Sequence, residues 1–146
     1  MIINIMVTRF NNNTWIENMR WREINNWKGC IYNCPTCLKH DIPINAELYI
    51  IEMNNEENRI EGIGKIKNKI FLDRKYKIYT DNNYNRYTYK GTKRIDREDI
   101  IEKEKLEKIE RLLFKGKTHL KRGQGISKVP YSKISEFQEF IINLLV

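Results

Sequence analysis

The sequence predicts an α+β fold in which a small curved β-barrel or sheet is flanked by helices. Residues 47–66 have the pattern strand, polar turn, strand, and other segments have the apolar spacing of amphipathic helices. The first strand of this hairpin is a nearly unbroken apolar run, as expected when both faces are covered. In the second strand, Gly62 and Gly64 lie on one face, which indicates a bulge, a tight bend, or the close approach of a ligand or another backbone.

The first part of the chain predicts a strand, a helix and a loop. Residues 1–7 are apolar and predict a first strand. Thr14 and Glu17 have the spacing of a capping box, so we expect a helix that begins there and ends near Gly29. Residues 29–43 contain two prolines and predict a loop. The broad face expected for the helix comprises Ile16, Met19, Arg20, Glu23, Ile24 and Trp27.

The second part predicts more strands and then two helices. Residues 67–79 predict a strand pair or a strand and turn, and residues 84–90 a half-exposed strand. A helix from Asp96 or Asp99 to Phe114 is followed by a basic loop at 115–128 and a C-terminal helix at 132–146. We expect residues 1–146 to form a single domain, with this loop and last helix packed on it. The apolar residues expected to face inward are Ile101, Leu106, Ile109 and Leu113 in the first helix, and Ile134, Phe137, Ile141 and Leu144 in the second.

Charge and cysteine content restrict the environment and the partner. The 146 residues carry a formal net charge of +8, which favours an anionic partner, nucleic acid before membrane. No apolar run approaches the length of a membrane span, and the chain does not open with a signal-peptide pattern. Three cysteines within eight residues do not suit a disulfide framework. They favour a reducing compartment, cytoplasmic or nuclear.

The cysteines also raise the question of a metal. Cys30, Cys34 and Cys37 have the C-x3-C-x2-C spacing, which resembles the iron–sulfur motif of radical S-adenosylmethionine enzymes. Those enzymes need a large barrel of parallel strands, and this chain has no such strand–helix alternation and no adjacent glycine pair. Zinc held by the three cysteines and His40 is an alternative, although the segment is very compact for four ligands. We favour three reduced cysteines with no metal or cofactor.

The basic loop is the first candidate for phosphate contact. No carboxylate occurs between Glu110 and Glu136, so Lys117, Lys121 and Arg122 lie in a local positive field. The glycines among them allow backbone amides to approach phosphates. The spacing is not that of a Walker loop. A merely solvated basic surface is the alternative.

Aromatic residues are the second candidate for contact. Trp15, Trp21 and Trp27 are six residues apart, which is not a helical repeat, so at least one ring should face away from the core. Tyr32 and Tyr87 lie among basic residues. An exposed ring beside a basic groove can stack an unpaired base, which contributes about 1–3 kcal/mol.

The Trp-bearing segment 15–21, the strand 48–53 and the strand 59–66 together resemble the PUA-like superfamily, in particular its EVE, YTH and ASCH branches. The resemblance implies a small β-barrel with flanking helices, and a pocket where a flipped or modified base enters an aromatic cage. The Ser- or Asn-rich pocket strand of methyladenosine readers has no clear counterpart here. The whole chain also resembles uncharacterised conserved proteins of large DNA viruses, which implies no activity. The matching residues are Trp15 and Trp21 in the aromatic segment and Ile60, Gly62 and Gly64 in the hairpin.

From these observations we expect a non-catalytic module that binds RNA or DNA, with a modified or flipped base as one form of ligand. No acid–base pair or nucleophile constellation indicates an enzyme. The alternatives are a zinc protein built on the cysteine segment, and a viral structural or packaging protein, in the host cell or the virion, that binds nucleic acid without specificity. The expected stacking residues are Trp15, Trp21, Tyr32 and Tyr87, and the expected phosphate contacts are Arg86, Lys117, Lys121 and Arg122.

Overall fold

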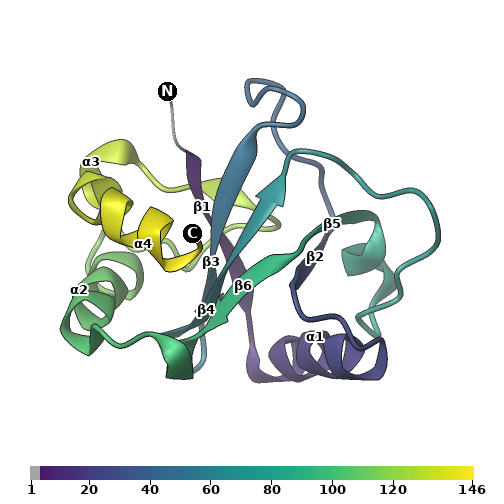
Figure 1. The fold of residues 1–146 in the computed structure, drawn as a ribbon, viewed down its shortest axis with the longest axis horizontal. Helices are drawn as coiled ribbons and strands as arrows, with labels where there is room; N and C mark the ends of the chain where they lie inside the picture. Colours follow the sequence, from purple (N-terminus) through teal and green to yellow (C-terminus); the bar gives the residue numbers. More distant parts are fainter. Residues whose placement is uncertain (1–3) are drawn as a thin grey trace.

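The computed structural model describes residues 4–146 and has an α+β architecture (Figure 1). Five strands form one sheet in the order β6-β4-β3-β1-β7, and β2 pairs with β5 in a second sheet. In the larger sheet β1 and β3 are parallel, and every other neighbouring pair is antiparallel. The strands are β1 (Asn4–Phe10), β2 (Cys30–Cys34), β3 (Glu47–Asn54), β4 (Arg59–Lys67), β5 (Tyr87–Gly91), β6 (Lys93–Asp96) and β7 (Ser127–Lys128). The helices are α1 (Asn12–Ile24), α2 (Lys103–Phe114), α3 (Tyr131–Ile134) and α4 (Gln138–Leu144), with 3-10 turns η1 (Asn82–Asn85), η2 (Arg97–Asp99) and η3 (Ser135–Phe137).

The larger sheet is open, so the closed form of the expected barrel is wrong. Its edges are β6 and β7, and the two-stranded β2–β5 sheet lies beside it without closing it. The expected hairpin of β3 and β4 is confirmed, and its register shifts between Glu52 and Met53. The bend or bulge expected from the glycines of β4 therefore belongs to an open sheet, in which the register shift lies in β3 opposite β4.

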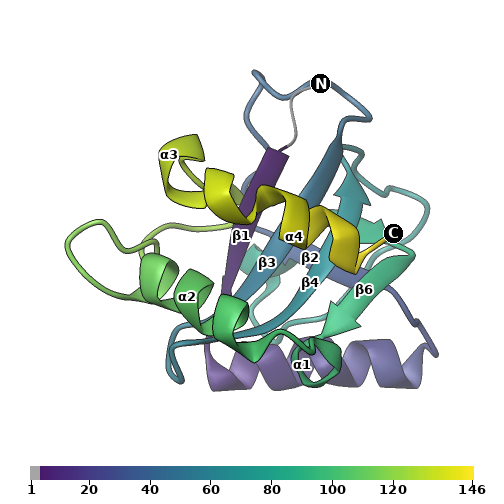
Figure 2. The same cartoon turned by 60° about the vertical axis from the view of Figure 1, so that its left-hand side comes forward.

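Two hydrophobic cores lie on opposite faces of the larger sheet. In β1, Ile5 and Val7 face the core under α2 and α4, whereas Met6 and Phe10 face the core under α1, β2 and β5. The period-2 alternation of a strand produces this division. Figures 1 and 2 show α2, α3 and α4 on one face, and α1 with β2 and β5 on the other.

The first helix has its capping box, but three residues earlier than expected. The side chain of Asn11 accepts from the Thr14 amide, and the Thr14 hydroxyl accepts from the Asn11 amide. Glu17 accepts instead from the amide and hydroxyl of Thr80, both at 2.7 Å. The expected buried face is wrong, because Ile24 is 81% exposed and Asn18 is the buried residue of the helix.

Other boundaries also differ from the expectation. Residues 30–34, expected as loop, are β2. Residues 67–79 were expected as a strand pair or a strand and turn, but residues 68–79 have irregular structure. The chain there is held by bonds such as Phe71 N–H to Thr88 O at 2.9 Å. The first strand covers Asn4–Phe10, and the part of the expectation on residues 1–3 lies outside the described residues.

The C-terminal helices were largely anticipated, with different bounds. α2 begins at Lys103 rather than at Asp96 or Asp99, and Ile101 is 86% exposed instead of inward. The last helix is divided into α3, η3 and α4. The expected inward positions Leu106, Ile109, Leu113, Ile134, Phe137 and Ile141 are all buried, and Leu144 packs partly buried against the same core. No helix within residues 4–146 is long and apolar enough to cross a membrane.

The glycines of β4 and β5 permit two layers of backbone to lie in contact. A Cβ atom on Gly64 would lie 2.3 Å from the Tyr32 hydroxyl and 2.6 Å from Cys30 Sγ. A Cβ atom on Gly91 would lie 1.9 Å from the carbonyl oxygen of Lys65. The β2–β5 layer therefore crosses β4 where both strands lack side chains. The paired glycines were expected to mark a bulge, a tight bend or a close approach of other atoms. At Gly64 the explanation is the close approach of protein atoms from β2.

A buried ion pair lies beneath this crossing. Arg94 donates two hydrogen bonds to Glu52, at 2.6 and 3.0 Å, and the Tyr32 hydroxyl donates to Glu52 at 2.6 Å. The side chains of Arg94 and Glu52 are only 6% and 2% exposed. Burial acts to lower the pKa of Arg94, but the charge and hydrogen bonds of Glu52 outweigh it, so that pKa is raised. Gly62 makes room for this pair, because a Cβ there would lie 2.5 Å from an Arg94 nitrogen.

We expect Glu52→Gln to lower the free energy of unfolding by about 3 kcal/mol, because Arg94 stays buried and keeps only its ion pair with the partly exposed Asp96. Urea denaturation measures this change. The matched control is Asp41→Asn, which breaks the exposed ion pair with Lys128 and should leave the midpoint unchanged. Equal effects of the two substitutions on the free energy of unfolding would show that the buried ion pair contributes no more to stability than the exposed one.

Candidate nucleic-acid interface

A groove of about 470 Å³ lies where β4, β5 and β6 come together. It is lined by Lys65 and Lys67 from β4, Lys90 from β5 and Lys93 from β6, together with Lys69 from the segment that follows β4. Glu47 is the one carboxylate among the lining residues, and Phe71 contributes an aromatic ring. We call this feature the lysine groove.

The lysine groove has a strong excess of positive charge. Glu47 pairs with Lys65 at 2.9 Å, and among the described residues the other four lysines have no carboxylate within ion-pair distance. Residues 65–93 contain nine basic and two acidic side chains, a net charge of +7, against +8 for the entire chain. The groove therefore lies in the segment that holds most of the protein's charge excess, where an anion would be attracted.

Aromatic rings surround one of these lysines. The Lys90 ammonium lies 4.9 Å from the ring centre of Trp27, 4.9 Å from that of Phe71 and 5.0 Å from that of Tyr76. The Lys69 ammonium lies 5.7 Å from the same Phe71 ring. These distances are within the range of cation–π attraction, which holds the two ammonium groups close to the ring surfaces.

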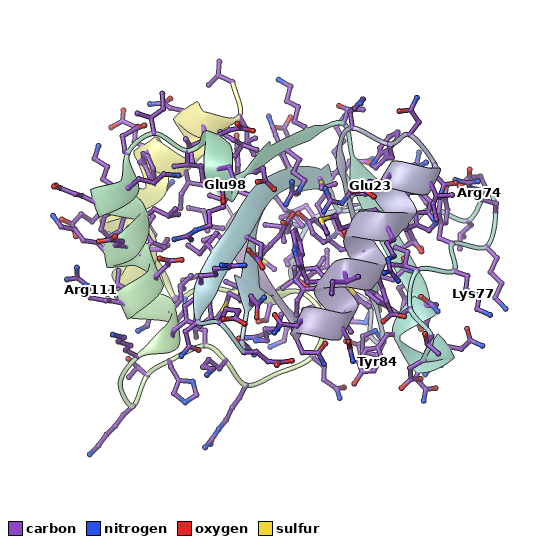
Figure 3. All side chains as sticks on the ribbon, turned by 90° about the horizontal axis from the view of Figure 1, so that it is seen from below. Glu23, Arg74, Lys77, Tyr84, Glu98 and Arg111 are labelled. Carbon is purple, nitrogen blue, oxygen red and sulfur yellow. The ribbon has the colours of Figure 1, made fainter. Side chains whose placement is uncertain are left out.

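A second hollow adjoins the lysine groove at Phe71, which lines both. Its basic lining residues are Arg74, Lys75 and Arg86, and its aromatic ones are Phe71, Tyr76 and Tyr87. The Arg74 guanidinium lies 5.6 Å from the Trp21 ring and 4.8 Å from the Tyr76 ring. In Figure 3, Arg74 and Lys77 project outward beyond α1, on the opposite side of the molecule from Arg111.

The structure brings three of the expected contact residues to this surface. Arg86 is exposed and Tyr87 half-buried, and both line the second hollow. Trp21 is half-buried in α1, with its ring 5.8 Å from that of Tyr76. Cations and rings therefore alternate from Trp21 through Arg74 and Tyr76 to Lys90.

Two other expected stacking residues are engaged inside the molecule. Tyr32 is 1% exposed and donates its hydroxyl proton to Glu52, so its ring offers no face to a ligand. The Trp15 ring lies 5.3 Å from the guanidinium groups of both Arg22 and Arg94, and 5.3 Å from the ring of Phe10. Trp15 is therefore part of the cover over the buried ion pair.

The three basic residues expected in the loop lie elsewhere. Lys117 and Arg122 are exposed and Lys121 is half-buried, in the chain between α2 and β7. None of them lines the lysine groove or the second hollow. The loop is fixed to the end of β1, because Arg9 Nε donates to the Leu120 carbonyl at 2.7 Å.

The lysine groove was missed because its residues were read as parts of separate strands. Lys65, Lys67, Lys90 and Lys93 come from three strands. The pairing of β4 with β6 and the packing of β5 across β4 place them together. The local signal was the total charge, since residues 65–93 carry a net charge of +7 against +5 for the shorter and more densely charged loop at 115–128. That total would have identified the segment but not the groove.

The cysteines do not gather into a ligand set. Cys30 and Cys34 are four residues apart in β2, so their Cα atoms are separated by about 13 Å at about 3.3 Å per residue. Both thiols are buried, whereas Cys37 is exposed. Within residues 4–146, no three His, Cys, Asp or Glu side chains are grouped so that they could hold a metal ion.

Burial also determines the protonation of the two strand cysteines. Loss of hydration raises the pKa of Cys30 to about 12, with the charge of Glu52 acting in the same direction. Loss of hydration alone raises the pKa of Cys34 to about 12. Both side chains are therefore neutral thiols at physiological pH, which are poor nucleophiles and poor metal ligands.

Comparison of the chain with models of protein families, with curated proteins and with solved structures found no match.

We expect one reactive thiol per folded chain. At pH 8, with pKa values of about 12, only about one in ten thousand of the Cys30 and Cys34 side chains is a thiolate. An Ellman titration should therefore detect one thiol in native protein and three in denaturant. Cys37→Ser should abolish the native reaction. Rapid native reaction of more than one thiol would contradict the enclosed position of β2.

Proposed function

We propose that this protein binds single-stranded nucleic acid along the lysine groove and the adjoining hollow. The observation that carries the proposal is the convergence of four lysines that have no carboxylate partner on a groove that also contains Phe71. Lysine ammonium groups neutralise backbone phosphates, and this electrostatic contribution dominates non-specific affinity for nucleic acids.

The aromatic rings favour a single strand over a duplex. Phe71 lines both hollows and is half-buried, as are Trp21 and Tyr87. Bases of a single strand are free to stack on such rings, whereas the bases of a duplex are already stacked on each other. Stacking on rings beside cations tolerates any base, so we expect little sequence preference.

The proposed ligand is the nucleic acid expected from the sequence, but the principal protein contacts lie in the lysine groove instead of the loop at 115–128. The phosphate contacts become Lys67, Lys69, Lys90 and Lys93, with Arg86 from the original set. The loop at 115–128 becomes a secondary region of positive charge. Nothing in this arrangement requires a catalytic group or a metal.

We expect the double substitution Lys67→Ala, Lys69→Ala to weaken binding of a 12-nucleotide single strand about tenfold at low salt. Each lost phosphate contact should also reduce the slope of log affinity against log salt by about 0.7. Fluorescence anisotropy at several salt concentrations measures both quantities. Both side chains are exposed, so the fold should be preserved.

The matched control is Lys108→Ala, Arg111→Ala, which removes the same charge from the exposed face of α2. This double variant should change the affinity for the single strand by less than about threefold. An equal loss in both double variants would mean that net charge alone drives binding, as in non-specific packaging. A duplex bound as tightly as the single strand would contradict the role of the rings.

A further inference from the structure

A separate pocket of about 240 Å³ lies at the opposite end of β1 from the N-terminus. It is formed by the end of β1, the start of α1, the end of β2, η1, and the Gly123–Gly125 turn of the basic loop, with Asn55 from the turn after β3. A cavity of about 150 Å³ already accepts a benzene ring. This pocket therefore has room for a larger planar group. We call it the Arg9 pocket.

Arg9 is the one charged side chain among the residues that line it. Its Nε donates to the Leu120 carbonyl, but Nη1 is shielded from solvent and has no hydrogen-bond partner among residues 4–146. No carboxylate of the described chain lies within ion-pair distance of Arg9. Loss of hydration lowers the pKa of this guanidinium, a sign that its charge is not compensated.

A second buried polar atom belongs to the same pocket. Asn55 Nδ2 donates to the Lys121 carbonyl at 2.8 Å, while Asn55 Oδ1 is shielded and unpartnered in the described chain. Buried polar atoms without partners are rare in folded proteins, and each one calls for an explanation. Here a cationic donor and a neutral acceptor without partners belong to residues that line the same pocket.

The glycine turn places backbone against the guanidinium. Gly123 has a φ of +120°, and a Cβ there would lie 3.2 Å from Arg9 Cζ and Nη1. Gly125, with a φ of +68°, completes the turn. A side chain at position 123 would therefore press on Arg9, and glycine allows the backbone of the turn to lie against the guanidinium.

From these residues we propose that the Arg9 pocket binds a phosphorylated nucleotide, either a free nucleoside monophosphate or the phosphorylated end of a strand. Arg9 attracts the phosphate, because its charge has no carboxylate partner in the described chain, and Nη2 is the guanidinium nitrogen left to donate to a phosphate oxygen. The Tyr84 ring, 39% exposed and lining the pocket, provides a face for the base.

The Arg9 pocket and the lysine groove have different lining residues and lie at opposite ends of β3, because Glu47 at its start lines the groove and Asn55, just after its end, lines the pocket. Tyr84 lies in η1 between Asn82 and Asn85, which line the second hollow. The 3-10 turn η1 therefore borders both the second hollow and the Arg9 pocket. The nucleotide site does not depend on the lysine groove, and each can fail without the other.

The test is isothermal titration of the intact protein with the four 5′-nucleoside monophosphates, their nucleosides, and inorganic phosphate. We expect one saturable site for at least one monophosphate, with its nucleoside at least tenfold weaker. Arg9→Gln should weaken the monophosphate at least tenfold. Arg122→Gln, an exposed neighbour that does not line the pocket, is the matched control and should change affinity less than twofold.

Two further variants keep the result decisive. Tyr84→Ala should weaken the monophosphate at least fivefold without changing the affinity for inorganic phosphate, and it decides the outcome if Arg9→Gln does not fold. Lys67→Ala, Lys69→Ala should leave monophosphate affinity within twofold, even where it weakens strand binding. That separation distinguishes failure of this site from failure of the lysine groove.

Binding of oligonucleotides with and without a terminal phosphate distinguishes a strand end from a free nucleotide as the ligand. An Arg9-dependent preference for 5′- or 3′-phosphorylated strands over hydroxyl-ended ones identifies a strand end as the ligand. Binding of monophosphates without such a preference identifies a free nucleotide. Absence of saturable binding to every monophosphate and phosphorylated strand, or binding unchanged in folded Arg9→Gln and in Tyr84→Ala, overturns the proposal.

Discussion

The close crossing of the β2–β5 layer over β4 is the constraint on which one half of this molecule depends. Gly64 and Gly91 lack the side chains that would keep the layers apart, and a Cβ at either position would collide with the opposite layer. The crossing encloses the ion pair of Glu52 and Arg94 together with the Tyr32 hydroxyl. A buried ion pair gains little over apolar packing, but it strongly disfavours arrangements that separate its members. The glycines and the charges therefore determine together where the second layer lies.

The candidate interface is a consequence of that placement. Because Gly91 lies on the carbonyl of Lys65, the ends of β4, β5 and β6 meet, and lysines from all three strands line one groove. The same crossing brings Lys90 among three aromatic rings that come from other parts of the chain. The opposite face of the sheet, under α2 and α4, has an apolar core, and the hollow there that holds Lys105, Lys108 and Phe140 is also lined by three glutamates. The close crossing of the two layers and the proposed binding surface therefore lie on the same side of the sheet.

Local patterns in the sequence predicted local features well. The β3–β4 hairpin, the inward positions of α2 and α4, and the unusual character of the β4 glycines all follow from spacing within a short segment. The sequence did not reveal what the glycines accommodate, because Tyr32, Cys30 and Arg94 are far from them along the chain. Glu17 was assigned to a cap, although Asn11 forms the cap and Glu17 binds Thr80, 63 residues away. The lysine groove was not predicted for the same reason, since it is assembled by the pairing of β4 with β6 and the crossing of β5 over β4.

Hydrogen–deuterium exchange of Gly64→Ala, compared with the unchanged protein, tests the central claim most directly. If the crossing depends on the missing side chain, amides of β2 and β5 should exchange faster, while those of α2 and α4, packed on the other core, keep their protection. Affinity for a single strand should fall in parallel, because the lysine groove loses its second wall. Unchanged protection in β2 and β5 would contradict the account, since the second layer would then hold its place without the close approach at Gly64.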